Sequence, residues 1–151
     1  MDTAGNLYFA DSSNRVRRVV AGVIATVAGN GTYGFTGDGG SALAAQLAGP
    51  TGLALDTAGN VYVADGSRIR RFLPGGVITT VAGSTTPGSG GDGGGATVAG
   101  LNYPTGLALS PAGTLYIADS GNHRLREVNA AGVIRTVAGT GVANLSGDGG
   151  D

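Results

Sequence analysis

The chain has 151 residues, 31 of them glycine, with no cysteine, one histidine and a formal net charge of −1. A hydrophobic content of 41 % excludes a highly charged disordered chain, and the lack of cysteine excludes disulfides and thiolate metal sites. The balanced charge argues against bulk attraction to nucleic acid or a membrane, and no apolar run reaches the roughly eighteen residues of a membrane-spanning helix. No signal-like segment opens the sequence, and the length alone predicts one domain.

An internal repeat organises the whole sequence. Four phrases return at intervals of 54 or 56 residues, which is the signature of a repeat architecture. DTAGNLYFAD begins at Asp2 and has counterparts at 56–65 and 110–119; GVIATVAG at 22–29 has counterparts at 76–83 and 132–139; GDGG begins at Gly37, Gly91 and Gly147; PTGLAL begins at Pro50 and Pro104. The repeat units span about 1–49, 50–103 and 104–151.

Each unit predicts four short strands separated by turns. The first is the compact apolar run GLAL, for which we expect burial on both faces. The second frames a tyrosine between aliphatic residues, and the third alternates arginine with aliphatic residues, which predicts a half-exposed strand. The fourth is rich in β-branched residues. In this order the predicted strands are 52–55 and 106–109; 7–10, 61–64 and 115–118; 15–17, 68–70 and 124–126; and 23–28, 77–82 and 133–138.

Glycine-rich connections follow the fourth strands at 30–49 and 84–103. Within the first connection, SALAAQL at 41–47 predicts one or two helical turns. The GDGG motif of each connection holds a single carboxylate among glycines. One carboxylate is too few for a calcium cage of clustered oxygens, so we interpret GDGG as a tight turn.

The third unit carries a family resemblance. Four-stranded units at this repeat length are typical of β-propeller blades. ADSGNHRLREV at 118–128 resembles the NHL repeat, and Asn122, His123 and Leu125 supply its named residues. Unit one keeps Asn14 but lacks the histidine, and unit two lacks both. The resemblance implies an all-β propeller, commonly six-bladed in this family, with GLAL nearest the central channel.

The strand count predicts a partial propeller over 1–151. Three strands in the first unit and four in each of the others make eleven, or about three blades. Such an arc exposes apolar surface at both ends, and we expect copies of the chain to cover it by joining head to tail. Two copies would form a six-bladed ring, which we favour, and three would form nine blades. A fragment of a longer propeller is the other interpretation of the missing inner strand.

The aspartate that closes each second strand recurs as Asp11, Asp65 and Asp119. One interpretation makes it a metal or substrate ligand. The other has its carboxylate cap the following turn or pair with a nearby arginine. Recurrence in every unit favours the structural role, because a ligand site normally needs asymmetry.

All nine cationic residues are arginine, and eight lie in the third strands. Arg17, Arg70 and Arg126 are the candidate ligand-binding residues, because a guanidinium can bind phosphate or carboxylate in a bidentate manner. The alternative is salt bridging between blades with the recurrent aspartate. Nucleic acid is not expected as a partner, since the charge is balanced and exposed stacking aromatics are few.

No catalytic constellation, metal site or cofactor motif is predicted, and His123 is expected to stabilise a turn. The first functional hypothesis is therefore a non-enzymatic binding or scaffold module that associates with itself and presents loops to a protein or an anionic ligand. The second is a metal-dependent hydrolase or lyase that uses the propeller channel, as some six-bladed relatives do. The third is a natural or engineered fragment with no selected ligand. The cellular compartment stays open.

Overall fold

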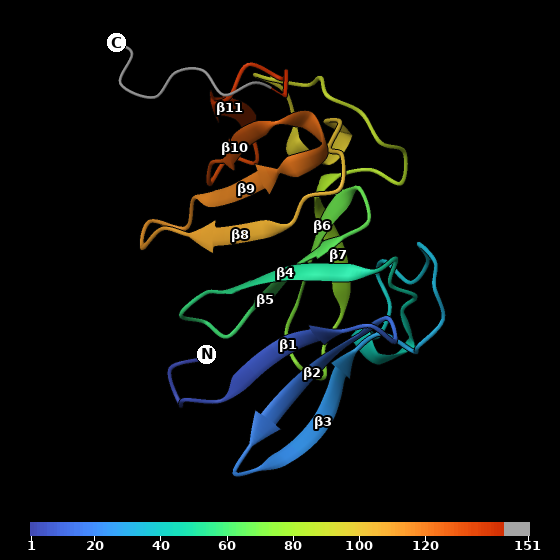
Figure 1. Cartoon of the computed structure of the whole chain (residues 1–151). Helices are drawn as coiled ribbons and strands as arrows, with labels where there is room; N and C mark the ends of the chain where they lie inside the picture. Colours follow the sequence, from blue (N-terminus) through green and yellow to red (C-terminus); the bar gives the residue numbers. More distant parts are fainter. Residues whose placement is uncertain (144–151) are drawn as a thin grey trace.

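The computed structural model describes residues 1–143 and consists of three antiparallel sheets, as the all-β propeller prediction requires (Figure 1). The described residues contain the eleven expected strands, three in the first sheet and four in each of the others. The sheets comprise β1 (Leu7–Asp11), β2 (Arg15–Val20) and β3 (Val23–Ala28); β4 (Pro50–Leu55), β5 (Val61–Asp65), β6 (Arg68–Phe72) and β7 (Ile78–Gly83); and β8 (Gly106–Leu109), β9 (Leu115–Asp119), β10 (Arg124–Val128) and β11 (Ile134–Ala138). The third GDGG motif lies outside the described residues.

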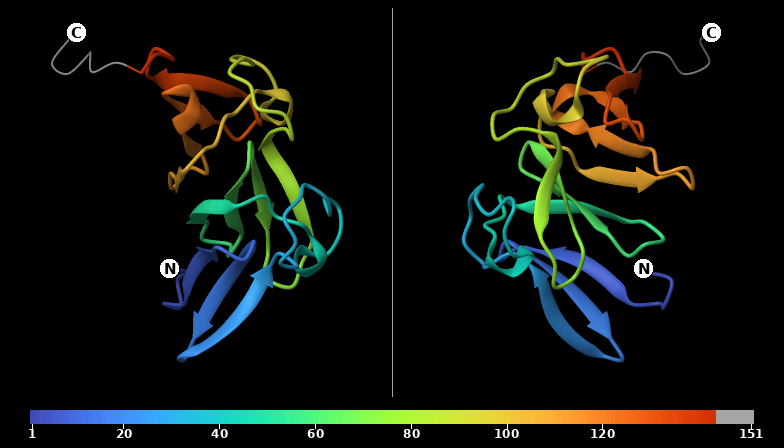
Figure 2. Two further views of the ribbon diagram at one scale, coloured as in Figure 1. Left: turned by 45° about the vertical axis from the view of Figure 1, so that its right-hand side comes forward. Right: turned by 180° about the vertical axis from the view of Figure 1, so that it is seen from behind.

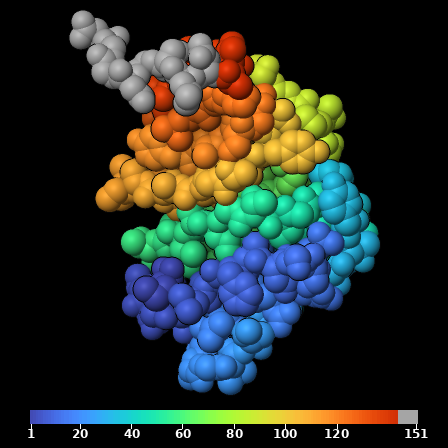
Figure 3. All heavy atoms as spheres, in the orientation of Figure 1, coloured from blue at the N-terminus to red at the C-terminus, as the bar shows by residue number. Residues whose placement is uncertain are grey.

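Each sheet is a simple meander in which strands adjacent in sequence are hydrogen-bonded neighbours. The second sheet lies between the first and the third, so the three sheets stack as successive blades (Figures 1, 2 and 3). The inner strands β4 and β8 approach closely. A Cβ atom added to Gly52 would lie 2.2 Å from the Thr105 carbonyl oxygen, so only glycine permits this spacing.

The inner strands are less buried than the sequence suggests. In the GLAL part of β4 only Ala54 is buried, while Leu53 and Leu55 are half-buried, and Ala108 in β8 is exposed. The expectation that GLAL is buried on both faces is therefore wrong. β4 and β8 are edge strands with a hydrogen-bonded neighbour on one side only, so their other side remains open.

Two apolar cores hold the sheets together, one at each boundary between neighbours. The first joins residues such as Val16 of the first sheet to Phe72 of the second. The connections are part of these cores, because each folds into a short 3-10 turn, η1 (Ala42–Ala44) or η2 (Ala96–Val98), followed by a fully buried leucine. The helical turn predicted within 41–47 is thus confirmed as η1.

The GDGG motif forms the predicted tight turn in the first two connections. In the first, the Gly40 amide donates a hydrogen bond to the Gly37 carbonyl oxygen over 3.1 Å. Gly37 has φ of 101°, and an added Cβ would lie 2.7 Å from the Ala45 Cα. Glycine is therefore required by both the backbone conformation and the space.

The turn between the second and third strands varies in length among the units. It holds three, two and four residues, at 12–14, 66–67 and 120–123, the last of which contains η3 (Ser120–Asn122). His123 follows η3 with φ of 52°, a left-handed conformation, so its place in the turn is as expected. Asn122 Nδ2 donates to the Asp119 carboxylate over 2.8 Å and to the Gly88 carbonyl oxygen over 2.7 Å. The asparagine thereby ties this turn to the preceding connection.

Candidate functional site

The recurrent aspartates have the structural role that their repetition indicates. Asp11 accepts hydrogen bonds from the amide and hydroxyl of Ser13 and lies 3.3 Å from Arg17 Nη1. Asp65 is buried and accepts from the Ala48 amide and from Arg68. These ion pairs form within a sheet, so the expectation of aspartate–arginine bridging between blades is wrong for them.

Arg70 of β6 is fully buried rather than half-exposed. Its Nη2 and Nε atoms donate to Asp38 Oδ1 over 2.6 and 2.9 Å, and its Nη1 lies 3.6 Å from Asp65 Oδ2. Nη1 also donates to the Gln46 carbonyl oxygen over 2.9 Å. The expected half-exposed third strand is thus wrong for β6, because the preceding connection folds over the guanidinium and supplies acceptors for it.

Arg126 of β10 repeats this arrangement in the third sheet. It is fully buried, and its Nη2 donates to Asp92 Oδ1 over 2.6 Å. Its Nη1 lies 3.4 Å from Asp119 Oδ2. The aspartate of each of these two GDGG motifs therefore pairs with the arginine of the sheet that follows it. Sequence reasoning missed this role, although the joint recurrence of GDGG and the arginine was a signal for it.

The Asp38 carboxylate is bound from both strands of a cross-strand pair. Thr80, opposite Arg70 in the β6–β7 register, donates to Asp38 Oδ2 from its amide over 3.1 Å and from its hydroxyl over 2.6 Å. Burial opposes ionisation of Asp38, but the hydrogen bonds from Thr80 and Arg70 and the charge of Arg70 lower its pKa below the ordinary value. An arginine and a threonine on paired strands thus form a carboxylate receptor.

Arg17 occupies the same repeat position in a different environment. Its side chain is 26 % exposed, and its Nε makes no hydrogen bond within the described residues. Thr26 lies opposite it in the β2–β3 register, as Thr80 lies opposite Arg70. Of the three arginines singled out in the sequence, Arg70 and Arg126 are therefore fully buried and bound to an aspartate of the preceding connection, and Arg17 is partly exposed and bound to Asp11. Binding of an external ligand stays a prediction for all three.

One face of the first sheet exposes large apolar side chains. Leu7, Phe9 and Ile24 are 52, 38 and 52 % exposed. Their counterparts in the second sheet are buried against the first sheet, and those in the third sheet are buried against the second. These counterparts are Val61, Val63 and Ile78, and Leu115, Ile117 and Ile134. The exposed face therefore has the composition of an inter-blade contact.

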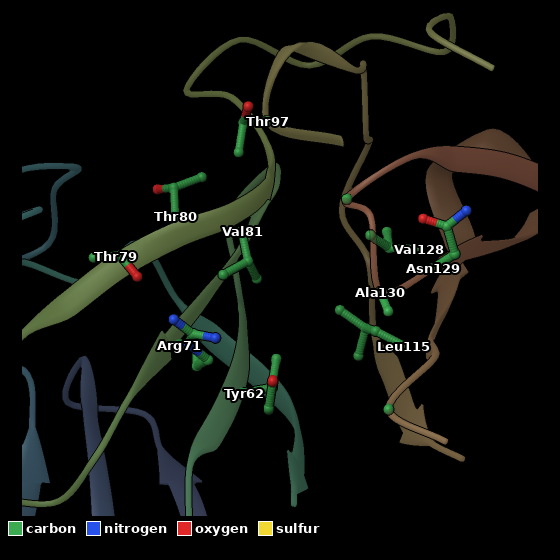
Figure 4. Close-up of a pocket in the computed structure, with 12 residues that line it drawn as sticks. Tyr62, Arg71, Thr79, Thr80, Val81, Thr97, Leu115, Val128, Asn129 and Ala130 are labelled. Atoms are coloured by element: carbon green, nitrogen blue, oxygen red, sulfur yellow. The ribbon is translucent and has the colours of Figure 1, made fainter. Parts of the chain in front are cut away.

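A groove of about 370 Å³ lies between the second and third sheets (Figure 4). Tyr62, Arg71 and Val81 of the second sheet face Leu115 and Val128 of the third across it (Figure 4). The cation in this groove is thus Arg71, which sequence reasoning did not select. Over residues 1–143 no three His, Cys, Asp or Glu side chains cluster as a metal site, and no helix is long and apolar enough to cross a membrane.

Comparison with protein families places two matches on the chain. The model of the teneurin NHL domain matches residues 31–90, and the NHL repeat model matches residues 101–127. Mouse teneurin-1 is 38 % identical over 109 residues, covering 68 % of this chain and 4 % of the teneurin. Human teneurin-4 is 31 % identical over 157 aligned positions, covering 90 % of this chain and 6 % of that protein. The chain thus spans a small part of the relatives it matches.

Solved structures share the fold at low sequence identity. A structural genomics protein of unknown function from Bacteroides thetaiotaomicron superimposes with a TM-score of 0.71 at 24 % identity, covering 93 % of this chain and 34 % of that one. An auxiliary nutrient binding protein from Bacteroides ovatus gives 0.64 at 24 %, with 90 and 36 % covered. A virginiamycin B lyase from Staphylococcus aureus gives 0.59 at 18 %, with 89 and 38 % covered. At these identities the likeness concerns the fold alone.

Proposed function

Because the chain belongs to the NHL-repeat family, we propose that it is a non-enzymatic binding or scaffold module whose blades form a closed ring by head-to-tail self-association. Two copies contribute six blades in this arrangement. The observation that carries the proposal is the exposed apolar face of the first sheet, since monomeric proteins rarely expose a contiguous patch of this kind.

The opposite end of the described structure offers the complementary surface. Leu125 and Val137 of the third sheet are 38 and 39 % exposed. Their repeat counterparts in the first sheet, Val16 and Val27, are buried in the core against the second sheet. The two end faces thus carry the residue types of the two halves of an inter-blade contact that exists twice within the described residues, which supports the proposal.

The energetic argument follows from burial. Full burial of a large apolar side chain contributes about 1.5–3 kcal/mol relative to leaving it exposed. Leu7, Phe9 and Ile24 and the apolar residues of the opposite face are already partly buried, so each supplies a fraction of such a contribution. A head-to-tail contact uses two different surfaces, and it closes into a ring when the rotation per copy allows.

The solution mass tests this function. Sedimentation equilibrium across micromolar concentrations is expected to give the mass of two chains. A mass of three chains would instead indicate nine blades. A chain that stays folded and strictly monomeric throughout this range would refute self-association.

A matched pair of variants locates the contact. Leu7→Asp places a charge on the exposed apolar face and is expected to shift the equilibrium to monomer, because the carboxylate loses its hydration in the contact. Val98→Asp is the control, since Val98 is 82 % exposed in η2, which belongs to the connection between the second and third sheets. Equal masses for the two variants would contradict the assigned face.

A further inference from the structure

We infer that the Arg17–Thr26 pair and the outer edge of β3 bind the Gly-Asp-Gly-Gly segment at 147–150 of a second copy of this chain. The inference rests on the proposed head-to-tail association and names the polar contact that would accompany its apolar face. Asp148 supplies the carboxylate in this arrangement, as Asp38 and Asp92 do in the two GDGG motifs that the structure describes.

The first line of evidence is the side-chain receptor. Asp38 is bound by Arg70 and Thr80, which are directly opposite in the β6–β7 register. Arg17 and Thr26 have the same residue types in the same cross-strand register. Two donors of the kind that bind the carboxylate in the second sheet are therefore present in the first.

The second line of evidence is the backbone at the sheet edge. In the second sheet the Gly39 amide donates to the Ile78 carbonyl oxygen over 2.9 Å, and the Ile78 amide donates to Gly40 over 3.0 Å. In the third sheet Ile134 exchanges the same two bonds with Gly93 and Gly94, over 2.8 and 3.0 Å. The GDGG segment thus adds a short antiparallel bridge beside the outermost strand.

The first sheet presents an equivalent edge. Ile24 is the counterpart of Ile78, and it lies in β3, which is an edge strand of its sheet. Its side chain is 52 % exposed, whereas that of Ile78 is fully buried. Addition of an extended segment to such an edge gives affinity through main-chain hydrogen bonds, while a side-chain contact gives specificity.

The order of the GDGG segments along the chain indicates which of them binds the Arg17–Thr26 pair. The GDGG segment at 37–40 binds the second sheet and the segment at 91–94 binds the third. The segment at 147–150 has the same four residues, and the first sheet has the equivalent arginine and threonine with no GDGG segment bound to them in the described residues. The first and third sheets lie at opposite ends of the described structure (Figure 3), so a head-to-tail contact brings this segment and this receptor together between copies.

The test compares Asp148→Asn with Asp151→Asn in the full chain. Both variants remove one negative charge, but the first two connections carry Ser41 and Gly95 at the position of Asp151. Asp148→Asn is expected to weaken association at least about tenfold, since hydrogen bonds to charged groups are the stronger class. Asp151→Asn is expected to leave the dissociation constant within about twofold.

A double-mutant cycle with Arg17→Gln assigns the partner. If Asp148 binds Arg17, the double variant associates no more weakly than the weaker single variant. Additive losses would overturn the assignment. Hydrogen exchange at the Ile24 amide reports the backbone contact separately: we expect protection that rises with association in the parent chain and is reduced in Asp148→Asn.

The outcomes separate this inference from the proposed ring. Association that is equally strong in Asp148→Asn and Asp151→Asn would overturn the inference and leave self-association intact. If the parent chain is monomeric, an acetylated peptide of residues 144–151 can be titrated onto the full chain. A shift of the Ile24 amide resonance that is lost with an Asp148→Asn peptide would then support the receptor, and no shift would overturn it.

Discussion

Arg17 and Arg70 lie at the same repeat position in two hairpins of nearly the same geometry, yet their environments differ. Arg70 is fully buried and bound to Asp38, whereas Arg17 is 26 % exposed and bound to Asp11 alone among the described carboxylates. The difference comes from the connection that precedes the second sheet and folds over Arg70. A blade of this protein is therefore completed by a segment of its neighbour.

Asp11 and Asp65 lie next to these arginines, and their pKa values shift in opposite directions. The hydroxyl of Ser13, followed by partial burial and further hydrogen bonds, acts on Asp11 and leaves its pKa below the ordinary value. Burial dominates at Asp65 and raises its pKa despite the Ala48 amide and the charges of Arg68 and Arg70. The aspartate of this repeat position thus has a lowered pKa in the first sheet and a raised pKa in the second, because Asp65 is more strongly desolvated than Asp11.

The largest expected effect comes from truncating the buried arginine. Arg70→Ala leaves the buried Asp65 carboxylate with less compensation and should lower the free energy of unfolding by about 3–5 kcal/mol. Arg17→Ala removes a partly solvated ion pair and should lower it by about 1 kcal/mol or less. Urea unfolding followed by circular dichroism measures both, and equal losses would show that the connection does not distinguish the two sites.

A smaller difference in the free energy of unfolding is expected between alanine variants of Ile78 and Ile24, which occupy the same repeat position. Ile78→Ala creates a cavity in the first core and should lower the free energy of unfolding by about 2–5 kcal/mol. Ile24→Ala should change it by less than about 0.5 kcal/mol in dilute, unassociated protein. Urea titrations at several protein concentrations test this, because the Ile24→Ala loss should grow once chains associate. A concentration-independent loss would contradict the assigned contact.

The smallest effect concerns acid stability. The folded-state pKa of Asp38 lies below its ordinary value of 3.8. Its contribution to the free energy of unfolding is therefore fully present above that value and is lost as pH falls through the folded-state pKa. The effect of Asp65 on the free energy of unfolding has the opposite pH dependence. Because its pKa is raised in the folded state, folding favours the protonated carboxyl, and its contribution to stability declines as pH rises through that pKa.

Asp38→Asn should therefore flatten the decline of unfolding free energy below about pH 4, while Asp11→Asn, with a weaker set of contacts, should flatten it less. Urea midpoints measured at steps of half a pH unit check the order. An identical acid profile for the parent chain and Asp38→Asn would refute the role assigned to this carboxylate.

Much of the fold followed from local pattern. The eleven strands, the three-stranded first sheet, the short helical turn and the GDGG turn could be predicted because alternation, β-branching and glycine act over a few residues. The structural role of the recurrent aspartates was also assigned correctly, since their partners include residues of the adjoining turn and strand. Local patterns could not show that GLAL would lie at an open edge, where most of its residues remain partly exposed.

The sequence by itself determined the repeat, the strands of each sheet and the turns between them, because these depend on neighbours along the chain. Only the tertiary structure decided which arginine is buried, since Asp38 reaches Arg70 across 32 positions and Asp92 reaches Arg126 across 34. It also decided which copy of a repeated apolar face remains exposed. Identical patterns acquire different burial because solvent is excluded by the adjacent blade and not by the strand that carries the pattern.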